Sequence, residues 1–578
     1  MSLIDWVVLV VTFILIISYG LYKSNATKNL EGYFLSNRSM PWYLVLLGIM
    51  GTQASAITFL SAPGQAYTDG MRFVQYYFGL PLAMIVIVVW FVPVFSKLKI
   101  FTAYEFLEQR FDLKTRTFTS FLFLLSRGLS TGISIYAPSI ILSSLLGWDI
   151  YWTNIAMGGM LTLYTVSGGS KAVAYTQQLQ FVIIFIGMVV SGYYLVHLLP
   201  DGLGFSDALK VGEVSGKLNV ITTGNTGSGF DFKDRYNIIS GTIGGFFLAL
   251  SYFGTDQSQV GRYITAKNDK ESKLGLLLNG VVKIPMQFLI LLLGVLLFTF
   301  YQFKESPIFF NRTVETKAWS TPYKDSLAAI QNQFKTAQAK QLELNTALVK
   351  TKKTDTALEN KIQKGAASLT ALQKNYKNVI ATAVPGADVN DTNYIFLRFV
   401  VDYLPVGLIG LLIAVIFLAA WGSIAAALNA LASCTVIDFH LRYRSKSIDG
   451  STLAQSASDY KTSKWYTLAW GVFCILTAQF ATGMGSLIEA VNVLGSLFYG
   501  VILGIFLVAF YAKKVGGTAV FWAAIVGEIF VIVCFWSYIF DYSLDFAAAS
   551  VSTCGLQKAP GMVRNSWISI SIYTLIYK

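Results

Sequence analysis

Long apolar runs follow one another along almost the whole chain, and they restrict the possible folds more than any other feature. A helix needs about 20 mostly apolar residues to cross the hydrocarbon core of a bilayer. We identify thirteen such runs, at residues 4–22, 41–66, 73–95, 117–145, 149–167, 177–199, 237–261, 274–302, 400–438, 465–484, 486–511, 517–540 and 563–577. Only 13% of the residues are charged, about half the share in soluble proteins. We therefore expect an all-α polytopic membrane protein, and we exclude soluble enzymes, nucleic-acid-binding proteins and disordered scaffolds.

The lysines and arginines of the short loops predict an orientation. One set of alternating loops, together with Lys578, holds 21 of these residues, and the opposite set holds seven outside the long polar segment described below. Basic residues concentrate in cytoplasmic loops. We therefore expect a multi-pass protein of the cell (inner or plasma) membrane, with its N-terminus outside and its C-terminus inside. The same distribution accounts for the net charge of +13 without a nucleic-acid partner.

Residues 303–395 form a long polar segment between apolar runs. From Leu327 to Val379, apolar residues recur at alternating steps of three and four, which is the spacing of heptads. The pattern predicts one long helix, or a helical hairpin broken near Lys352–Thr356, outside the membrane. Such a coiled-coil-like insertion is either a solvated spacer or a docking site for a partner protein.

Cysteine and histidine provide no sign of metal or nucleophile chemistry. The four cysteines, Cys434, Cys474, Cys534 and Cys554, show no CxxC spacing, and the two histidines lie at the ends of apolar runs. We expect no disulfide framework, no zinc site, no catalytic residues and no enzymatic activity.

The second apolar run is unusually rich in polar and small residues. Four hydrogen-bonding side chains lie within seven residues, beside two glycines and before a proline: Gly48, Gly51, Thr52, Gln53, Ser55, Thr58 and Pro63. This composition favours an interrupted helix, whose free carbonyl groups can bind a cation while its side chains hold a solute. The alternative is ordinary helix packing through small residues.

Four other runs carry weaker signals of function. Gly422 and Ser423 in the ninth run could add oxygens to a cation site, and the residues around Asp256 suggest another loosened helix. Arg127 and Lys283 are cations inside apolar runs, where each needs a partner or water. Each either contacts the substrate or forms a structural ion pair, for example with Asp256 or Glu489.

Several motifs together resemble the sodium/solute symporter family, which includes symporters of proline, galactose, sialic acid, glucose, iodide and vitamins. The resemblance covers nearly all runs except 303–395. The motifs are Ser55-Ala-Ile-Thr-Phe, Thr102-Ala-Tyr-Glu-Phe-Leu-Glu-Gln-Arg-Phe, Ile135-Tyr-Ala-Pro, Tyr164-Thr-Val-Ser-Gly-Gly, Thr255-Asp-Gln, Arg262, Leu428-Asn-Ala, Thr435-Val-Ile-Asp and Asn492-Val-Leu-Gly-Ser-Leu-Phe-Tyr-Gly. The resemblance implies a LeuT-like core of five plus five inverted-repeat helices. Residues 1–302 would hold an N-terminal helix, the first repeat and the start of the second, and residues 396–578 the rest of the second repeat and two additional helices.

The resemblance also implies a sodium site. Its residues would be Gly51, Ala54, Ala419, Gly422 and Ser423. Family members usually carry two adjacent hydroxyl residues where this chain has Gly422 and Ser423, so one oxygen ligand is missing. A second sodium site of some members uses an aspartate where this chain has Gln177. We therefore expect one coupling sodium ion.

The substrate residues implied by the resemblance come from both repeats. They are Gln53, Ser55, Thr58, Gln75, Tyr76, Tyr77, Asp256, Gln257, Lys283 and Asn492. Sialic-acid members grip a carboxylate with an arginine where this chain has Ser130, and Arg127 stands one helical turn earlier. Tyr252 is the candidate gate residue.

The sequence thus predicts a sodium-coupled symporter that imports a small polar organic solute, such as a sugar, a polyol or a carboxylate like sialic acid, by alternating access. Two alternatives remain open. One is a proton-coupled symporter of the same fold, with Asp256 or Glu489 as the proton carrier. The other is a transporter-like solute sensor that signals through the external helical segment. A passive channel is disfavoured, because no continuous polar stripe runs through any apolar run.

Overall fold

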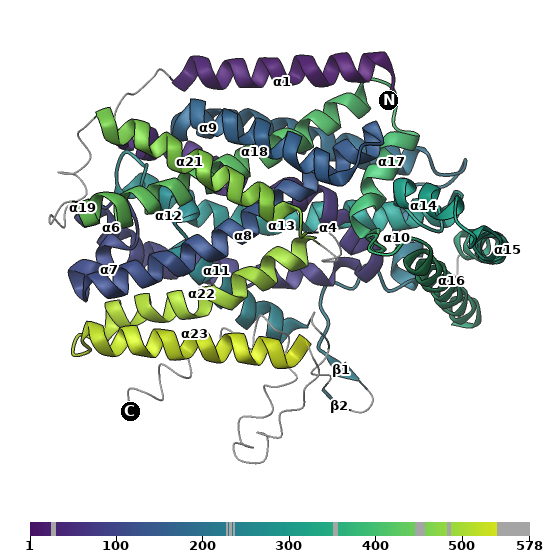
Figure 1. Ribbon diagram of the computed structural model, residues 1–578. Helices are drawn as coiled ribbons and strands as arrows, with labels where there is room; N and C mark the ends of the chain where they lie inside the picture. Colours follow the sequence, from purple (N-terminus) through teal and green to yellow (C-terminus); the bar gives the residue numbers. More distant parts are fainter. Residues whose placement is uncertain are drawn as a thin grey trace.

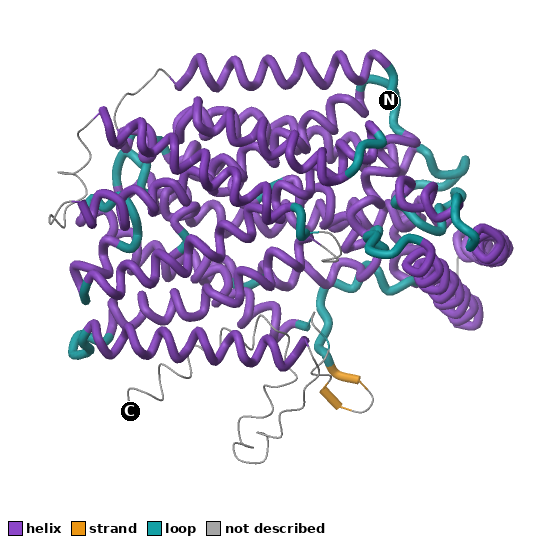
Figure 2. The backbone as a smooth tube through the Cα atoms, viewed as in Figure 1, coloured by secondary structure: helices purple, strands orange, loops and turns teal. Residues whose placement is uncertain are grey.

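The computed structural model describes residues 1–539 except 25–29, 227–228, 231–233, 235–236, 351–355, 445–456 and 482–486. The described chain is mostly helical, and its long helices run side by side in roughly one direction (Figure 1; Figure 2). The thirteenth predicted run, at 563–577, lies outside the described residues.

The helices up to the polar segment are α1 (Leu3–Ser24), α2 (Leu30–Leu35), η1 (Ser36–Arg38), α3 (Trp42–Gln53), α4 (Ala56–Asp69), η2 (Gly70–Tyr77), α5 (Leu80–Val86), η3 (Ile87–Phe91), α6 (Val92–Leu98), α7 (Glu105–Arg110), α8 (Leu113–Leu146), α9 (Ile150–His197), α10 (Phe205–Val214), η4 (Ser240–Gly244), α11 (Gly245–Thr255), α12 (Gln257–Tyr263) and α13 (Asp269–Phe303). The later helices are α14 (Arg312–Trp319), α15 (Lys324–Lys350), α16 (Thr356–Ala383), η5 (Thr392–Tyr394), α17 (Ile395–Tyr403), α18 (Leu408–Cys434), η6 (Thr435–Leu441), α19 (Arg442–Arg444), α21 (Ala457–Ala478), α22 (Leu487–Tyr511) and α23 (Gly517–Ile539). A short antiparallel pair, β1 (Asn225–Thr226) and β2 (Gly229–Phe230), lies in a loop.

Eight helical stretches of the described chain are long and apolar enough to cross a membrane. They are Leu3–Gly20, Ala56–Leu98, Leu113–Leu146, Val173–His197, Asp269–Phe303, Leu408–Arg444, Ala490–Tyr511 and Gly517–Phe535. Many of their apolar side chains face outward, including Leu15, Val189 and Trp522. Such faces need a lipid solvent, so the chain is a multi-pass membrane protein. The count of thirteen spans stays a prediction.

Helix α9 covers two of the predicted runs, 149–167 and 177–199, as one helical stretch of 48 residues. It does not run straight. Tyr164 Oη lies 3.2 Å from Thr176 Oγ1, although residues twelve apart in a straight α-helix are separated by about 18 Å along its axis. The chain therefore bends between these two residues, and the second part of α9, Val173–His197, is one of the eight stretches able to cross a membrane.

The polar segment forms a pair of long helices at one end of the bundle. Helices α15 and α16 pack against each other and flank residues 351–355, which lie outside the described residues (Figure 1). The N-terminus lies at the same end of the molecule, and α6, α7 and α19 lie at the opposite end. Of the two predicted forms, the structure has the helical hairpin. Three apolar residues of the heptad pattern, Leu327, Phe334 and Tyr376, are buried in a small separate core that also includes Ile308 and Phe309. Leu348 and Ile362 of the same pattern are buried in the main core.

The second apolar run is interrupted, as its composition predicts. Helix α3 ends at Gln53 and α4 starts at Ala56. Between them, Ala54 has ψ 73° and Ser55 has ψ 176°, both outside the helical range. A comparable break separates α11 from α12 at Asp256, where ψ is 117°. Two helices of the bundle are therefore broken in the middle of apolar runs.

Candidate functional site

A cavity with an empty volume of about 1100 Å³, its opening to solvent included, lies beside the break between α3 and α4. Its walls come from α3, α4, η2, α8, α11, α18 and α22. Broken helices supply backbone groups without helical partners, and such groups bind ions and polar solutes. The cavity is therefore the candidate binding site.

Many of the residues that the sequence assigned to a substrate site line this cavity. They are Gln53, Ser55, Thr58, Tyr76, Tyr77 and Asn492. Tyr252, Arg127 and Ser423 line it as well. Gln53 Oε1 is buried without a hydrogen-bond partner, which leaves this oxygen ready to accept a hydrogen bond from a polar ligand. These placements agree with a site built around the broken helix.

Four residues of the same predicted set do not line the cavity. Gln75 instead contacts the Thr222 region, where its Nε2 donates to Thr222 Oγ1 at 3.1 Å. The Gln257 side chain binds the loop before α7. Its Nε2 donates to Phe101 O (2.8 Å), and its Oε1 accepts from Ala103 N (2.9 Å).

Lys283 is fully buried on α13, with its Nζ 5.7 Å from the centre of the Tyr77 ring. It lies behind a residue of the cavity wall, and not in the wall itself. The fourth residue, Asp256, is held in the charged cluster described next.

Arg127 and Asp256 form an ion pair beside the cavity. Arg127 Nη1 lies 3.7 Å from Asp256 Oδ2, which also accepts a hydrogen bond from Tyr499 Oη at 2.7 Å. The other carboxylate oxygen of Asp256 accepts from Ser258 N at 2.7 Å. Of the two interpretations of Arg127, the ion pair with Asp256 is present. The side chain of Glu489 lies outside the described residues.

Arg127 also lines the cavity, and its guanidinium can donate hydrogen bonds beyond the ion pair with Asp256. Its side chain is only 8% exposed, and its Nε is buried without a hydrogen-bond partner. Its guanidinium lies 5.7 Å from the centre of the Tyr252 ring. The Tyr252 hydroxyl accepts a hydrogen bond from Gln259 Nε2 at 2.6 Å. Tyr252, the candidate gate residue, therefore packs against the charged cluster of Arg127 and Asp256.

The sequence analysis missed some residues of the cavity wall. Thr131 and Ser134 on α8 and Tyr499 on α22 line it. Arg127, Thr131 and Ser134 follow one another at steps of four and three, which places them on one face of a helix. This polar stripe is visible in the sequence and could have identified the face. Tyr499 lies in the motif that begins at Asn492, but that motif indicated only family membership and gave Tyr499 no role in the site.

Helices α3, α9 and α18, which carry most of the predicted sodium-site residues, pack against one another, and Gly51 and Gly422 both lie against Gln177 of α9. Because Ser55 N donates to Gln53 O (3.0 Å), Gly51 O loses the amide that would bind it in a continuous helix. Ser423 Oγ donates to Ala420 O at 3.0 Å and can still accept or coordinate through its lone pairs. Backbone and hydroxyl oxygens of this kind suit a hard cation. The residues present therefore fit sodium, and Gly51, Ala54, Ala419 and Ser423 would hold it.

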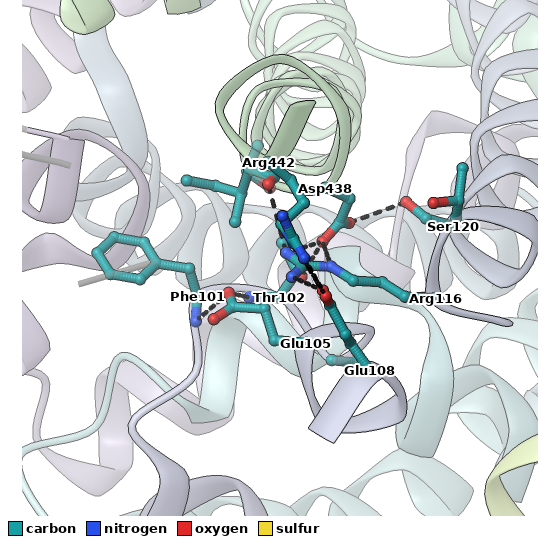
Figure 3. A network of polar contacts seen from close by, with 12 residues as sticks. Phe101, Thr102, Glu105, Glu108, Arg116, Ser120, Asp438 and Arg442 are labelled. Atoms are coloured by element: carbon teal, nitrogen blue, oxygen red, sulfur yellow. Dashed lines mark hydrogen bonds and ion pairs between the residues drawn. The ribbon is translucent and has the colours of Figure 1, made fainter. Parts of the chain in front are cut away.

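A second polar cluster lies at the end of the bundle near α7 and α19 (Figure 3). Arg116 of α8 is 1% exposed. Its Nη1 lies 2.8 Å from Glu108 Oε2, and its Nη2 lies 2.7 Å from Asp438 Oδ1. Ser120 Oγ and Thr102 Oγ1 donate to the two oxygens of Asp438, at 2.8 and 2.7 Å. The cluster therefore ties α8 to η6 and to the loop before α7.

The acidic partner Glu108 is held from two sides. Arg442 donates to its Oε1 at 2.6 Å, and Arg116 donates to its Oε2 at 2.8 Å. Burial acts to raise the pKa of Glu108, but these two arginines outweigh it and hold the pKa below its ordinary value. Two of the motifs that carry the family resemblance, those beginning at Thr102 and Thr435, thus meet in this cluster and not in the cavity.

The family model of the sodium:solute symporter family matches residues 33–318 and 364–527. The gap in this match, residues 319–363, covers α15 and the first residues of α16. Among similar curated proteins, the human "Sodium/iodide cotransporter" is 30% identical over 278 residues, which cover 47% of this chain and 41% of that protein. "Sodium-coupled monocarboxylate transporter 1" of Xenopus laevis is 29% identical over 306 residues, 51% of this chain and 47% of that protein. The chain thus matches somewhat less than half the length of these relatives.

A solved structure shows the same fold. It is titled "Substrate-bound outward-open state of a Na+-coupled sialic acid symporter reveals a novel Na+-site", and it aligns with a TM-score of 0.70 and 23% identity. The alignment covers 99% of this chain and 97% of that chain. Transporters of this architecture bind their solutes and coupling ions near the bilayer midplane, beside discontinuous helices. In this chain the break between α3 and α4 falls near the middle of the apolar run 41–66.

Proposed function

Because the chain belongs to the sodium:solute symporter family, we propose that it is a sodium-coupled secondary active symporter that imports a small polar organic solute by alternating access. One observation carries this proposal. A cavity whose wall includes Gln53, Ser55 and Asn492 opens at the break between α3 and α4, beside the place where α3 packs against α18. A solute and a cation at these two places would share the broken helix, which couples their binding.

The charges of the two ends predict how the protein is oriented in the membrane. The end with α6, α7 and α19 carries Lys97, Arg110 and Arg442, and by the distribution of basic residues it faces the cytoplasm. The hairpin of α15 and α16 would then lie outside, as an extracytoplasmic insertion in residues 303–395. We assign it no role in transport, because it cannot line a path through the bilayer.

The proposed mechanism assigns separate tasks to the chain's residues. Bound sodium supplies a positive charge that joins α3 to α18 and favours the outward-facing state. Gln53, Ser55, Thr58 and Asn492 offer hydrogen bonds to the solute, and Tyr76 and Tyr77 offer aromatic surface. Tyr252 closes over the solute. Its hydroxyl is held by Gln259, and its ring lies beside the guanidinium of Arg127.

The substrate class is a sugar, a polyol or a carboxylate such as sialic acid. The test is thermal stability of the purified protein in sodium, against potassium or choline, with a panel of sugars, polyols, sialic acid, amino acids and short carboxylates. A ligand that binds the folded state raises the melting temperature by mass action. A solute effect that grows with sodium supports the proposal. A solute effect that depends on pH and ignores sodium would indicate proton coupling instead.

We expect the Ser423→Ala variant to need about tenfold more sodium for half-maximal uptake. The reason is the loss of one oxygen ligand, and interactions of a polar group with a charge contribute about 1.5–3 kcal/mol. The measurement is initial uptake rate against sodium concentration in proteoliposomes. Ser433→Ala is the matched control, because Ser433 Oγ makes the same type of bond on the same helix, to Ala430 O at 2.9 Å. Equal sodium dependence in both variants would contradict the sodium-site assignment.

A further inference from the structure

A second cavity lies between the hairpin of α15 and α16 and the end of the bundle, and we call it the hairpin cavity. Its empty volume is about 970 Å³, its opening to solvent included. The bundle contributes the C-terminal parts of α4 and α13 and the loop after α10, and the hairpin contributes both of its helices. The wall shares no residue with the central cavity beside the break between α3 and α4. The part of the wall on α15 lies within residues 319–363, which the family model does not match.

Hydrogen bonds hold the hairpin against the bundle around this cavity. Asn345 Nδ2 of α15 donates to Gln302 Oε1 of α13 at 3.2 Å. Lys210 Nζ of α10 donates to Leu348 O at 2.9 Å. A site whose walls are already fixed loses less free energy on binding than one that must order its walls first. The hairpin cavity is therefore a preformed place for a ligand.

The wall combines aromatic rings with side-chain amides. These residues are Tyr67, Phe298, Phe334, Gln302, Gln338, Gln341 and Gln373. Sugar rings pair well with such surfaces, because their C–H faces pack on aromatic rings and their hydroxyl groups exchange hydrogen bonds with amides. The composition of the wall therefore favours a hydroxylated ring as the ligand.

The protein itself does not use all the polar groups of this wall. The side-chain amide of Gln373 makes no hydrogen bond within the described part of the chain. Tyr301 and Gln341 are 1% and 3% exposed, and each keeps a buried oxygen without a hydrogen-bond partner. Native proteins rarely leave buried polar groups without a partner. The unused groups therefore point to a polar ligand at this wall.

Lys217 gives the wall a positive charge. Its Nζ lies 5.1 Å from the centre of the Phe298 ring and donates to Thr68 O, and an ammonium group has three donors. Among the described residues that line the cavity there is no Asp or Glu. Burial lowers the pKa of Lys217 below its ordinary value, and the nearby carboxylate of Asp69 opposes this only in part. The wall therefore favours a ligand with a negative charge.

We propose that the hairpin cavity is a second binding site and that it takes a sugar acid. The ring lies on the aromatic residues, the hydroxyl groups bind the amides, and the carboxylate binds Lys217. Helix α4 connects the two cavities, since Thr58 lines the central one and Tyr67 lines the hairpin cavity. In the orientation proposed above, a solute meets the hairpin cavity on the outer side of the membrane. The hairpin thus acquires a binding role without lining the path through the bilayer.

The test is calorimetric titration of the purified full-length chain in choline chloride without sodium. The probes are glucuronate, galacturonate and sialic acid, compared with glucose, which lacks the carboxylate, and acetate, which lacks the ring. We expect at least one sugar acid to bind more tightly than both comparison compounds. No sodium is needed, because a lysine and not a bound cation holds the carboxylate.

A blocking variant assigns this binding to the hairpin cavity. Ala367 lines the cavity at an exposed position of α16, so an indole in Ala367→Trp should fill the space and abolish the binding. Ala381→Trp is the matched control, because Ala381 is an exposed alanine of the same helix that does not line the cavity. This control should bind like the native protein, and melting temperatures check that both variants are folded.

A second variant tests the charge. Lys217→Met keeps an unbranched side chain and removes the ammonium group. We expect the dissociation constant of the sugar acid to rise about tenfold or more, because hydrogen bonds between charged groups are lost. The affinity for glucose should change much less.

Three results would each overturn the proposal. They are no binding of any sugar acid to the native protein, equal binding by Ala367→Trp and Ala381→Trp, and an unchanged dissociation constant in Lys217→Met. Sodium-dependent uptake through the central cavity is compatible with all three. Failure of this proposal is therefore distinct from failure of the proposed sodium-coupled transport.

Discussion

Replacing Arg127 by leucine is expected to lower solute affinity by about 10- to 100-fold and to destabilise the protein as well. The affinity loss follows from removing a charged donor from the cavity wall, since hydrogen bonds to charged groups contribute about 1.5–3 kcal/mol. The stability loss follows from Asp256, which is 1% exposed and would keep only Tyr499 and Ser258 as partners. Removing one member of a buried ion pair typically costs about 3–5 kcal/mol.

A second variant separates the two effects of Arg127. In Arg127→Leu with Asp256→Asn, no uncompensated charge remains at the pair, so most of the stability should return. If Arg127 contacts the solute, stabilisation by the best ligand of the sugar, polyol and carboxylate panel stays lost in the double variant. If the double variant regains both stability and ligand response, Arg127 acts only through its ion pair. Melting temperature with and without that ligand measures both quantities in one experiment.

Local composition was sufficient to predict the parts of this fold that depend on short-range chemistry. Gly48, Gly51 and the hydroxyl residues near Ser55 predicted an interrupted helix, and α3 ends at Gln53. The heptad spacing from Leu327 predicted one long helix or a hairpin; the structure has the hairpin, and Leu327 is buried in the small core beside it. These features depend on neighbours in the chain, so the sequence shows them directly.

Contacts between segments far apart in the chain are harder to predict from the sequence than local structure. The sequence predicts that polar residues at a broken helix belong to the substrate site, yet Gln257 uses its amide to hold the loop at Phe101 and Ala103. Gln177 was interpreted only as a lost carboxylate, because its position between Gly51 and Gly422 depends on three helices packing together. A spacing rule cannot distinguish a polar side chain that holds a neighbouring backbone from one that faces a cavity.

The cluster around Arg116 is the clearest example of such a long-range contact. Arg116 and Asp438 are 322 positions apart in the chain. Asp438 belongs to a motif that indicated only family membership, and Arg116 belongs to none of the quoted motifs. In the structure they form a buried ion pair on the side of the bundle away from the hairpin (Figure 1; Figure 3). The cluster joins α8 to η6 through charges, so the packing of these elements should depend on each charge being compensated.

We therefore expect Arg116→Leu to lower the free energy of unfolding by about 3–5 kcal/mol. Glu108 would keep Arg442 as a partner, but Asp438, which is 0% exposed, would keep only neutral donors such as Ser120 and Thr102. Removing both charges, in Arg116→Leu with Asp438→Leu, should recover most of the loss, because the cost comes from the uncompensated carboxylate.

Lys273→Leu is the control, because its ion pair with Asp269 is more than a third exposed on both sides and should contribute less than about 1 kcal/mol. Melting temperatures of the purified variants in one detergent give the comparison. Equal melting temperatures for Arg116→Leu and Lys273→Leu would show that this buried cluster does not stabilise the bundle.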